Sequence, residues 1–164
     1  MKIGIYEGVD SLVTAILKRT HKNDLNTFLE ESFPNLFGTG NISFLQHLFT
    51  VPLPLRANFT FILLYGQSNT GIPLLDKEII LAFGMIDGSK KGEYLLKNLC
   101  RKKGIEWKGV GKHILKALDR YAITNGIHVV SLVAENDNLI KYYTKLGWTL
   151  REDIRKKYMI KSFK

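Results

Sequence analysis

The hydrophobic pattern changes its period twice after the first third of the chain, and this change constrains the fold more than any other feature. Residues 58–65, 78–86 and 93–101 are rich in β-branched and aromatic residues, which predicts three consecutive strands in an antiparallel meander. Residues 109–124 then repeat apolar side chains every three or four positions, which indicates an amphipathic helix. The uninterrupted apolar run at 129–133 predicts a strand buried on both faces.

Weaker patterns on either side complete a sheet and its covering helices. Alternation predicts a strand at 2–6, and helical spacing predicts a helix at 11–19 with Asp10 or Ser11 as its N-cap. The other predicted elements are helices at 24–33 and 137–146, strands at 148–152 and 155–162, loops at 34–55 and 66–76, and turns at 87–92 and 153–154. The sum is an α/β sandwich with one mixed, mostly antiparallel sheet of about seven strands and about four helices.

Basic residues gather in two segments. The formal net charge is +9. Residues 97–116 hold seven bases and one acid, hence +6, and residues 151–164 hold six bases and two acids, hence +4. Concentrated charge indicates a local anionic partner, with a solvated surface as the alternative, which is favoured for the C-terminal segment.

Several classes of protein are excluded by simple counts. The single cysteine, Cys100, excludes an internal disulfide framework and a multi-cysteine zinc site. No apolar run is long enough to span a bilayer, and the first residues lack the apolar segment of a signal peptide. We therefore expect one domain over residues 1–164, in the reducing cytoplasm, with no metal.

The stretch Trp107-Lys108-Gly109-Val110-Gly111-Lys112 carries the chemistry. It follows a predicted strand and opens a predicted helix, whose first amide groups have no partner inside the helix. Glycines let a ligand approach the backbone, and the helix dipole favours an anion there. The stretch therefore predicts a phosphate site. It is not a mononucleotide P-loop, since neither Ser nor Thr follows Lys112, and it lacks the third glycine of the dinucleotide fingerprint.

A second motif follows at a fixed distance. Asn136 precedes a predicted helix, and Tyr143 stands seven residues after it and four before Gly147 and Trp148. With the loop ending at Gly111, this arrangement resembles the GCN5-related N-acetyltransferase (GNAT) superfamily. That superfamily joins an Arg/Gln-x-x-Gly-x-Gly/Ala loop to an Asn and a Tyr-x-x-x-Gly-Phe helix end. The resemblance is clearest from residue 77 to residue 163.

The resemblance implies a GNAT-like fold and the transfer of an acetyl group from acetyl-CoA to a primary amine through a ternary complex. It implies that Tyr143 is the general acid, because a phenol stays protonated at neutral pH. It also implies a set of cofactor-binding residues, namely Leu99, Arg101, Trp107, Lys108, Gly109, Val110, Gly111, Lys112 and Asn136.

Some of these roles have structural alternatives. Tyr143 also fits a core position, Asn136 also fits a helix N-cap, and the adjacent Tyr142 is interpreted as structural. The general base is left open between Glu135, Asp87 and Glu93.

The loop departs from the family at Glu106, which replaces the usual Arg or Gln. A carboxylate there would repel a pyrophosphate, so an inactive CoA-binding scaffold is one alternative function. A basic nucleic-acid-binding module is another, which the absence of zinc-finger spacing and RNP-type aromatic strands disfavours. We expect an amine substrate and no membrane partner. The acceptor's identity is left open, and the family's habit of forming dimers allows a homodimer.

Overall fold

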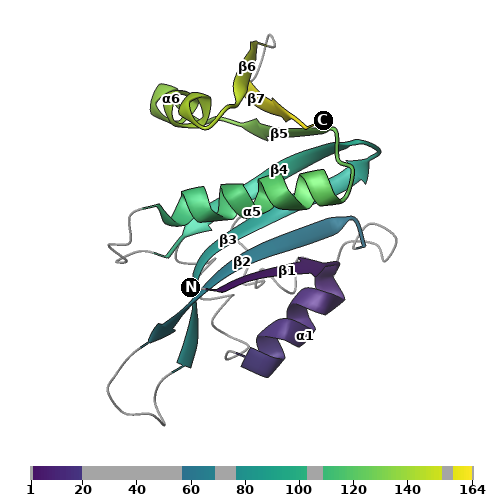
Figure 1. The fold of residues 1–164 in the computed structure, drawn as a ribbon, viewed down its shortest axis with the longest axis vertical. Coiled ribbons are helices and arrows are strands. Elements are labelled where there is room, and N and C mark those ends of the chain that lie inside the picture. Colours follow the sequence, from purple (N-terminus) through teal and green to yellow (C-terminus); the bar gives the residue numbers. More distant parts are fainter. Residues whose placement is uncertain (1, 20–56, 69–76, 103–108, 153–156, 164) are drawn as a thin grey trace, which may run out of the picture.

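The computed structural model describes residues 2–19, 57–68, 77–102, 109–152 and 157–163. Their strands form one seven-stranded sheet in the order β1-β2-β3-β4-β5-β7-β6 (Figure 1). The strands are β1 (Lys2–Glu7), β2 (Phe59–Ser68), β3 (Lys77–Lys90), β4 (Glu93–Arg101), β5 (Val129–Val133), β6 (Thr149–Glu152) and β7 (Lys157–Ser162). This is the predicted mixed α/β sheet.

The sheet is antiparallel except at its centre. β2, β3 and β4 form the predicted meander, and β1 adds to β2 as an antiparallel edge strand. β5 lies parallel to β4, while β7 pairs antiparallel with both β5 and β6. A parallel pair needs a crossover connection, which is provided here by helix α5 (Val110–Thr124).

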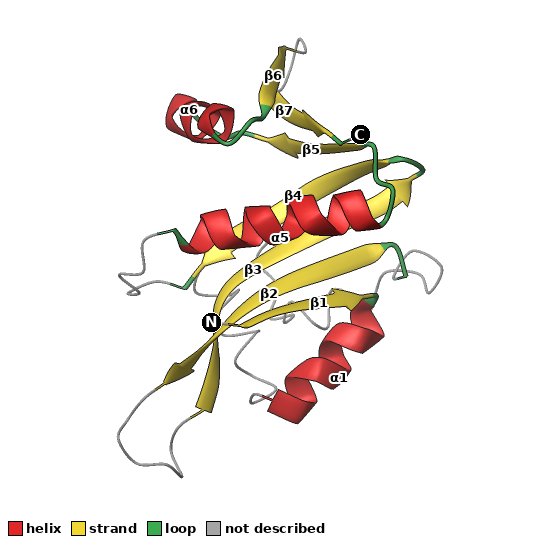
Figure 2. Ribbon diagram, in the orientation of Figure 1, coloured by secondary structure: helices red, strands yellow, loops and turns green. Residues whose placement is uncertain are grey.

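Helices cover opposite faces of the sheet, and Figure 2 shows α5 lying across the strands on one of them. α1 (Val9–Arg19) packs in a cluster with Phe61 and Leu63, whereas α5 packs in a second cluster with Ile62 and Leu64. Because successive strand residues point to opposite faces, α1 and α5 lie on opposite sides of β2. The third described helix, α6 (Asp137–Lys145), contributes Tyr143 to the α5 cluster. The predicted helix at 24–33, the loop at 34–55 and the turn at 153–154 lie outside the described residues.

The start of α1 differs from the prediction. The helix begins at Val9, so Asp10 and Ser11 lie in its first turn and neither is the N-cap. Gly8 has a φ of 84°, and its carbonyl accepts a hydrogen bond from the amide of Leu12 at 3.3 Å. A left-handed glycine therefore turns β1 directly into α1, in a register that buries Val9 and Leu12.

Two other predictions were wrong in detail. β3 continues through the predicted turn as far as Lys90, and β2 continues into the predicted loop as far as Ser68, because cross-strand pairing extends both strands. β5 is buried on one face only: Val130 and Leu132 are in the core, whereas Val133 is 44% exposed. The helices that follow β4 and β5 pack together on the face that carries Val130 and Leu132, and no described helix covers the other face of β5.

Within the described ranges, no helix is both long enough and apolar enough to cross a membrane.

Candidate active site

The parallel strands β4 and β5 diverge soon after they meet. Within the described residues, their pairing covers only Glu93–Leu95 and Val129–Ser131. Figure 2 shows the two strands separating toward the end where α5 begins and where α6 lies. From Leu96 onward, the β4 edge that faces β5 therefore has backbone groups without a β5 partner. In open α/β sheets, ligands bind beyond the carboxyl ends of such strands.

A β-bulge at Lys97 changes which residues of β4 face this region. Met85 of β3 pairs with Asn98 and Ile86 pairs with Leu96, so Lys97 has no opposite residue. Leu96 and Leu99 both pack in the α5 cluster although they are three residues apart. Simple alternation would place Leu99 on the other face. The bulge therefore directs Leu99, and with it Arg101, toward α5 and α6.

The N-terminus of α5 is not capped by a side chain. Gly109 is the N-cap residue with a φ of 86°, and its carbonyl accepts the first intrahelical hydrogen bond from the amide of His113 at 3.0 Å. The amides of Val110, Gly111 and Lys112 precede that bond, and the first turn carries no acidic residue. Together with the helix dipole, this end of α5 suits an anion.

The N-terminus of α6 is different because it already has its cap. The Asn136 side chain accepts a hydrogen bond from the amide of Leu139 at 2.9 Å. Asn136 therefore does act as the N-cap of α6, which was the alternative to a cofactor-binding role. Its Oδ1 atom is used in the cap, while its Nδ2 donor remains for a ligand, so the predicted cofactor contact stays a prediction.

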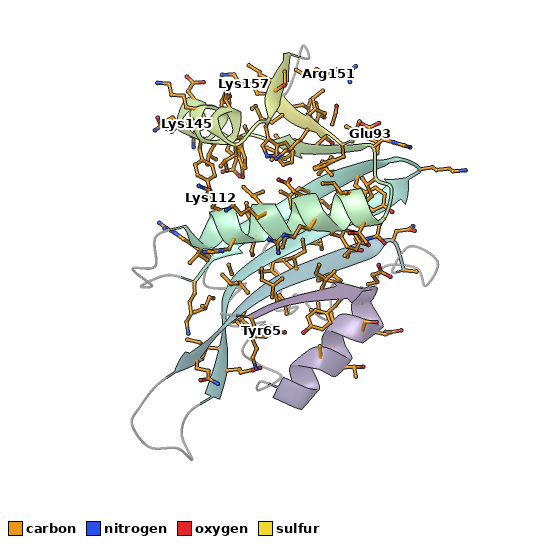
Figure 3. All side chains as sticks on the ribbon, viewed as in Figure 1. Tyr65, Glu93, Lys112, Lys145, Arg151 and Lys157 are labelled. Carbon is orange, nitrogen blue, oxygen red and sulfur yellow. The ribbon has the colours of Figure 1, made fainter. Side chains whose placement is uncertain are left out.

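Space and charge beside α5 agree with a phosphate group. A methyl group on Gly109 would meet nothing within 4 Å, and one on Gly111 would lie 3.5 Å from the hydroxyl oxygen of Tyr142. Lys112 is exposed at this end of α5 (Figure 3), and Arg101 is exposed at the end of β4. Arg101 also acts electrostatically on Tyr142, opposing the rise that burial causes in its pKa. The ends of β4, α5 and α6 thus converge.

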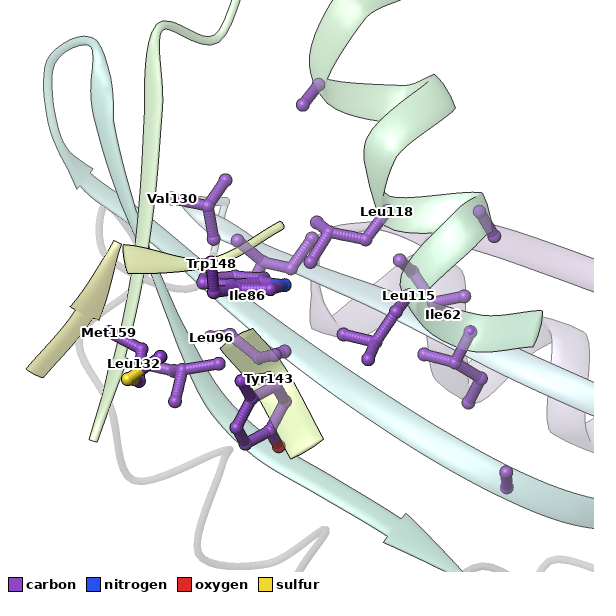
Figure 4. Packing of buried hydrophobic residues seen from close by; sticks show 14 of the residues in the cluster. Ile62, Ile86, Leu96, Leu115, Leu118, Val130, Leu132, Tyr143, Trp148 and Met159 are labelled. Carbon is purple, nitrogen blue, oxygen red and sulfur yellow. The ribbon is translucent and has the colours of Figure 1, made fainter. Parts of the chain in front are cut away.

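Tyr143 lies in the core next to this region. Its ring is 8% exposed and contacts the rings of Tyr142 and Trp148 edge-on, at centroid distances of 5.4 and 5.9 Å. Its hydroxyl points away from the indole (Figure 4), and no hydrogen bond joins it to a described residue. Burial, aided by Tyr142 and the nearby Glu135 carboxylate, raises the pKa of Tyr143 to about 12. The hydroxyl is therefore protonated at neutral pH.

The three carboxylates considered as general bases lie in different places. Glu135 follows β5, is exposed, and acts electrostatically on Tyr143. Asp87 forms an ion pair with Lys97 at 3.1 Å. Glu93 is the first residue of β4, whereas Arg101 is the last. Figure 3 shows Glu93 near the opposite end of α5 from Lys112. The structure brings only Glu135 close to Tyr143.

Apart from Asn136, the predicted cofactor residues fall into three groups. The first group is the N-cap and first turn of α5, made of Gly109, Val110, Gly111 and Lys112. The side chain of Val110 is buried, so only its amide is available to a ligand. Leu99 and Arg101 face the same region from β4. Trp107 and Lys108 lie outside the described residues, as does Glu106, the position at which the loop departs from the family motif. Among the described residues, no group of three or more His, Cys, Asp or Glu side chains is placed to hold a metal ion.

Comparison with known families gives one match. The model described as the Acetyltransferase (GNAT) family matches residues 55–148, which is more than half of the chain. No curated protein sequence matches significantly.

Solved structures share the fold at low sequence identity. An aminoglycoside 6'-acetyltransferase type Ii has a TM-score of 0.65 and 12% identity, with 99% of this chain and 97% of that chain covered. The PaiA N-acetyltransferase from Thermoplasma acidophilum, in complex with coenzyme A, has a TM-score of 0.57 and 14% identity, with 99% and 100% covered. A KacTA–DNA complex has a TM-score of 0.57 and 17% identity, with 98% and 93% covered.

Proposed function

The chain belongs to the acetyltransferase (GNAT) family, and from this premise we propose that it transfers an acetyl group from acetyl-CoA to a primary amine. Transfer is direct, in a ternary complex of enzyme, acetyl-CoA and amine. Tyr143 is the general acid and Glu135 the general base.

One observation supports this proposal above all others: the uncapped first turn of α5 opens beside Tyr142, whose ring contacts the buried, protonated Tyr143, on the side toward which β4 and β5 diverge. The amides of residues 110–112 and the two glycines fit the pyrophosphate of CoA, because they offer donors and, among the described residues, no side chain comes closer than 3.5 Å to where a methyl group on either glycine would lie. Arg101 and Lys112 add positive charge. The unpaired edge of β4 near Leu99 offers backbone groups to the pantetheine arm.

The chemistry divides between the cofactor and the protein. Bound acetyl-CoA supplies the thioester whose carbonyl carbon the amine attacks. Tyr143 donates its phenolic proton to the sulfur atom as the C–S bond breaks, which avoids release of a bare thiolate. Its raised pKa keeps this proton available across the physiological range. Glu135 takes the proton that the amine loses, and its exposure lets the proton pass on to solvent.

The test is thermal melting of the full chain with acetyl-CoA, using ATP and NAD as controls. At a hundred times the dissociation constant, a ligand stabilises the folded state by about 2.7 kcal/mol, which shifts the melting temperature by several degrees. We expect a shift with acetyl-CoA alone. A screen of primary amines for release of free CoA thiol then tests turnover.

Other outcomes would favour the alternative functions. Binding of acetyl-CoA without turnover on any amine would favour an inactive scaffold. A shift with a DNA or RNA oligonucleotide that disappears as salt rises would favour nucleic-acid binding. No shift with acetyl-CoA, in a protein that melts cooperatively, would contradict the proposal.

A further inference from the structure

Packing in the core does not account for the position of the Tyr142 side chain. It is a large side chain on α6, yet it is 39% exposed. Its hydroxyl lies beside the first turn of α5, 3.5 Å from where a methyl group on Gly111 would be. Its ring rests against the ring of Tyr143, with a centroid distance of 5.4 Å and an interplanar angle of 68°. The ring therefore contacts the core through Tyr143, and the hydroxyl lies at the uncapped helix end.

Arg101, at the end of β4, acts electrostatically on the same phenol. It lowers the pKa of Tyr142, which burial raises more strongly, so the two side chains are close enough to interact electrostatically. The bulge at Lys97 is what turns this part of β4 toward Tyr142. A cation, a phenol and the open amides of α5 therefore surround one small region, with each of the three coming from a different element.

We propose that Tyr142 is a cofactor-binding residue whose hydroxyl donates a hydrogen bond to the pyrophosphate of acetyl-CoA at the N-terminus of α5. This inference rests on the proposed function and adds to it a residue that the sequence motifs do not contain. A phenol donates well to an anion, and hydrogen bonds to charged groups are stronger than neutral ones. Tyr142 and Tyr143 thus divide the work: one hydroxyl holds the phosphate and the other protonates the sulfur.

The experiment compares two ligands in Tyr142→Phe. Acetyl-CoA carries the pyrophosphate, whereas S-acetylpantetheine has the same thioester and arm without it. We expect Tyr142→Phe to weaken acetyl-CoA binding roughly tenfold by calorimetric titration, and to leave S-acetylpantetheine binding unchanged. The melting temperature without ligand should stay the same, because the ring and its contact with Tyr143 are kept.

The matched control is Tyr94→Phe, which removes a hydroxyl at the start of β4, far from the first turn of α5. It should bind both ligands like the wild type. Equal affinity of wild type and Tyr142→Phe for acetyl-CoA would overturn the inference and leave the proposed function standing. An equal loss of affinity for both ligands would also overturn it, because the hydroxyl would then act on the pantetheine arm. Failure of the wild type to bind acetyl-CoA would instead remove the proposed function.

Discussion

The ring of Tyr143 packs edge-on against the indole of Trp148, with centroids 5.9 Å apart and an interplanar angle of 63°. Trp148 is 2% exposed, so the tyrosine ring is held against a fixed neighbour. Backbone hydrogen bonds add to this contact, since the amides of Leu146 and Trp148 both donate to the Tyr143 carbonyl. The orientation of the phenol is therefore set by the fold and does not depend on its hydroxyl.

Tyr143→Phe should separate catalysis from binding. The ring contacts remain, so the melting temperature and the affinity for acetyl-CoA should change little, whereas kcat should fall about a hundredfold or more because the proposed general acid is lost. Steady-state kinetics with the amine found in the screen measures the effect. A kcat equal to that of the wild type would assign protonation of the sulfur to another group, and Tyr158→Phe serves as a control tyrosine outside the α5 cluster.

The raised pKa of Tyr143 predicts a loss of stability at high pH. In the unfolded chain the phenol loses its proton near its ordinary value of 10.0, whereas in the folded protein it keeps it until about 12. Between these two pH values the folded state therefore binds more protons than the unfolded state. The stability that this difference contributes is fully present below pH 10 and is lost as the pH rises through 12. Urea unfolding should show the wild type losing on the order of 2 kcal/mol more than Tyr143→Phe over this interval. If the free energy of unfolding had the same pH dependence in the two proteins, the raised pKa of Tyr143 would be contradicted.

Two glycine substitutions should have different effects. Gly111→Ala places its methyl group at an ordinary contact distance from Tyr142, so the protein should fold normally. It should bind acetyl-CoA about tenfold more weakly, because the methyl group would occupy the space proposed for the pyrophosphate beside the backbone. Gly109→Ala meets no neighbour but forces alanine into a φ of 86°, which should cost about 1–2 kcal/mol of stability. Unchanged affinity in Gly111→Ala would show that the phosphate site is misplaced.

Asn136 can be tested for its two roles separately. Asn136→Ser keeps an oxygen that can accept from the amide of Leu139 but lacks the amide donor. Asn136→Ala lacks both. We expect alanine alone to lose about 1 kcal/mol in the free energy of unfolding, and both variants to raise KM for acetyl-CoA. If serine binds acetyl-CoA like the wild type, Asn136 is an N-cap only.

Lys161 of β7 should be a strong stabilising residue. Its Nζ atom donates to Asp119 of α5 at 2.8 Å and to the carbonyl of Leu146, at the end of α6, at 3.1 Å. The pair is mostly buried, with side chains 21% and 29% exposed. Lys161→Met keeps the aliphatic stem but leaves the carboxylate and the carbonyl without this donor.

We expect Lys161→Met to lower the free energy of unfolding by about 2 kcal/mol. Lys157→Met is the control, because Lys157 and its partner Asp137 are 58% and 80% exposed. The hydrogen bond from Lys157 lowers the pKa of Asp137, yet loss of this pair should cost far less than loss of the Lys161 pair, because both side chains are exposed to solvent. Similar losses in the two variants, measured by urea unfolding, would contradict the bridging role of Lys161.

Much of the fold is predictable from local patterns. The meander, α5 and α6 have strong hydrophobic periods and glycine boundaries, and Gly126 and Gly147 adopt the left-handed conformation that ends those helices. The start of α1 and the length of β3 are less predictable, because burial of Val9 and pairing of β3 with its neighbours override the turn residues in the sequence. Cross-strand pairing is a non-local interaction, which a local pattern does not contain.

The sequence by itself determined the α/β class, the open first turn of α5 and the spacing that places Asn136 at the N-cap of α6 and Tyr143 about two turns further along the helix. Each of these follows from backbone chemistry within a few residues. Only the tertiary structure decided that the bulge at Lys97 turns Arg101 toward α5, that β4 and β5 diverge after three paired residues, and that Tyr142 meets Gly111. These relationships depend on the register between strands and on the packing of helices on the sheet, which residues far apart in the chain set jointly.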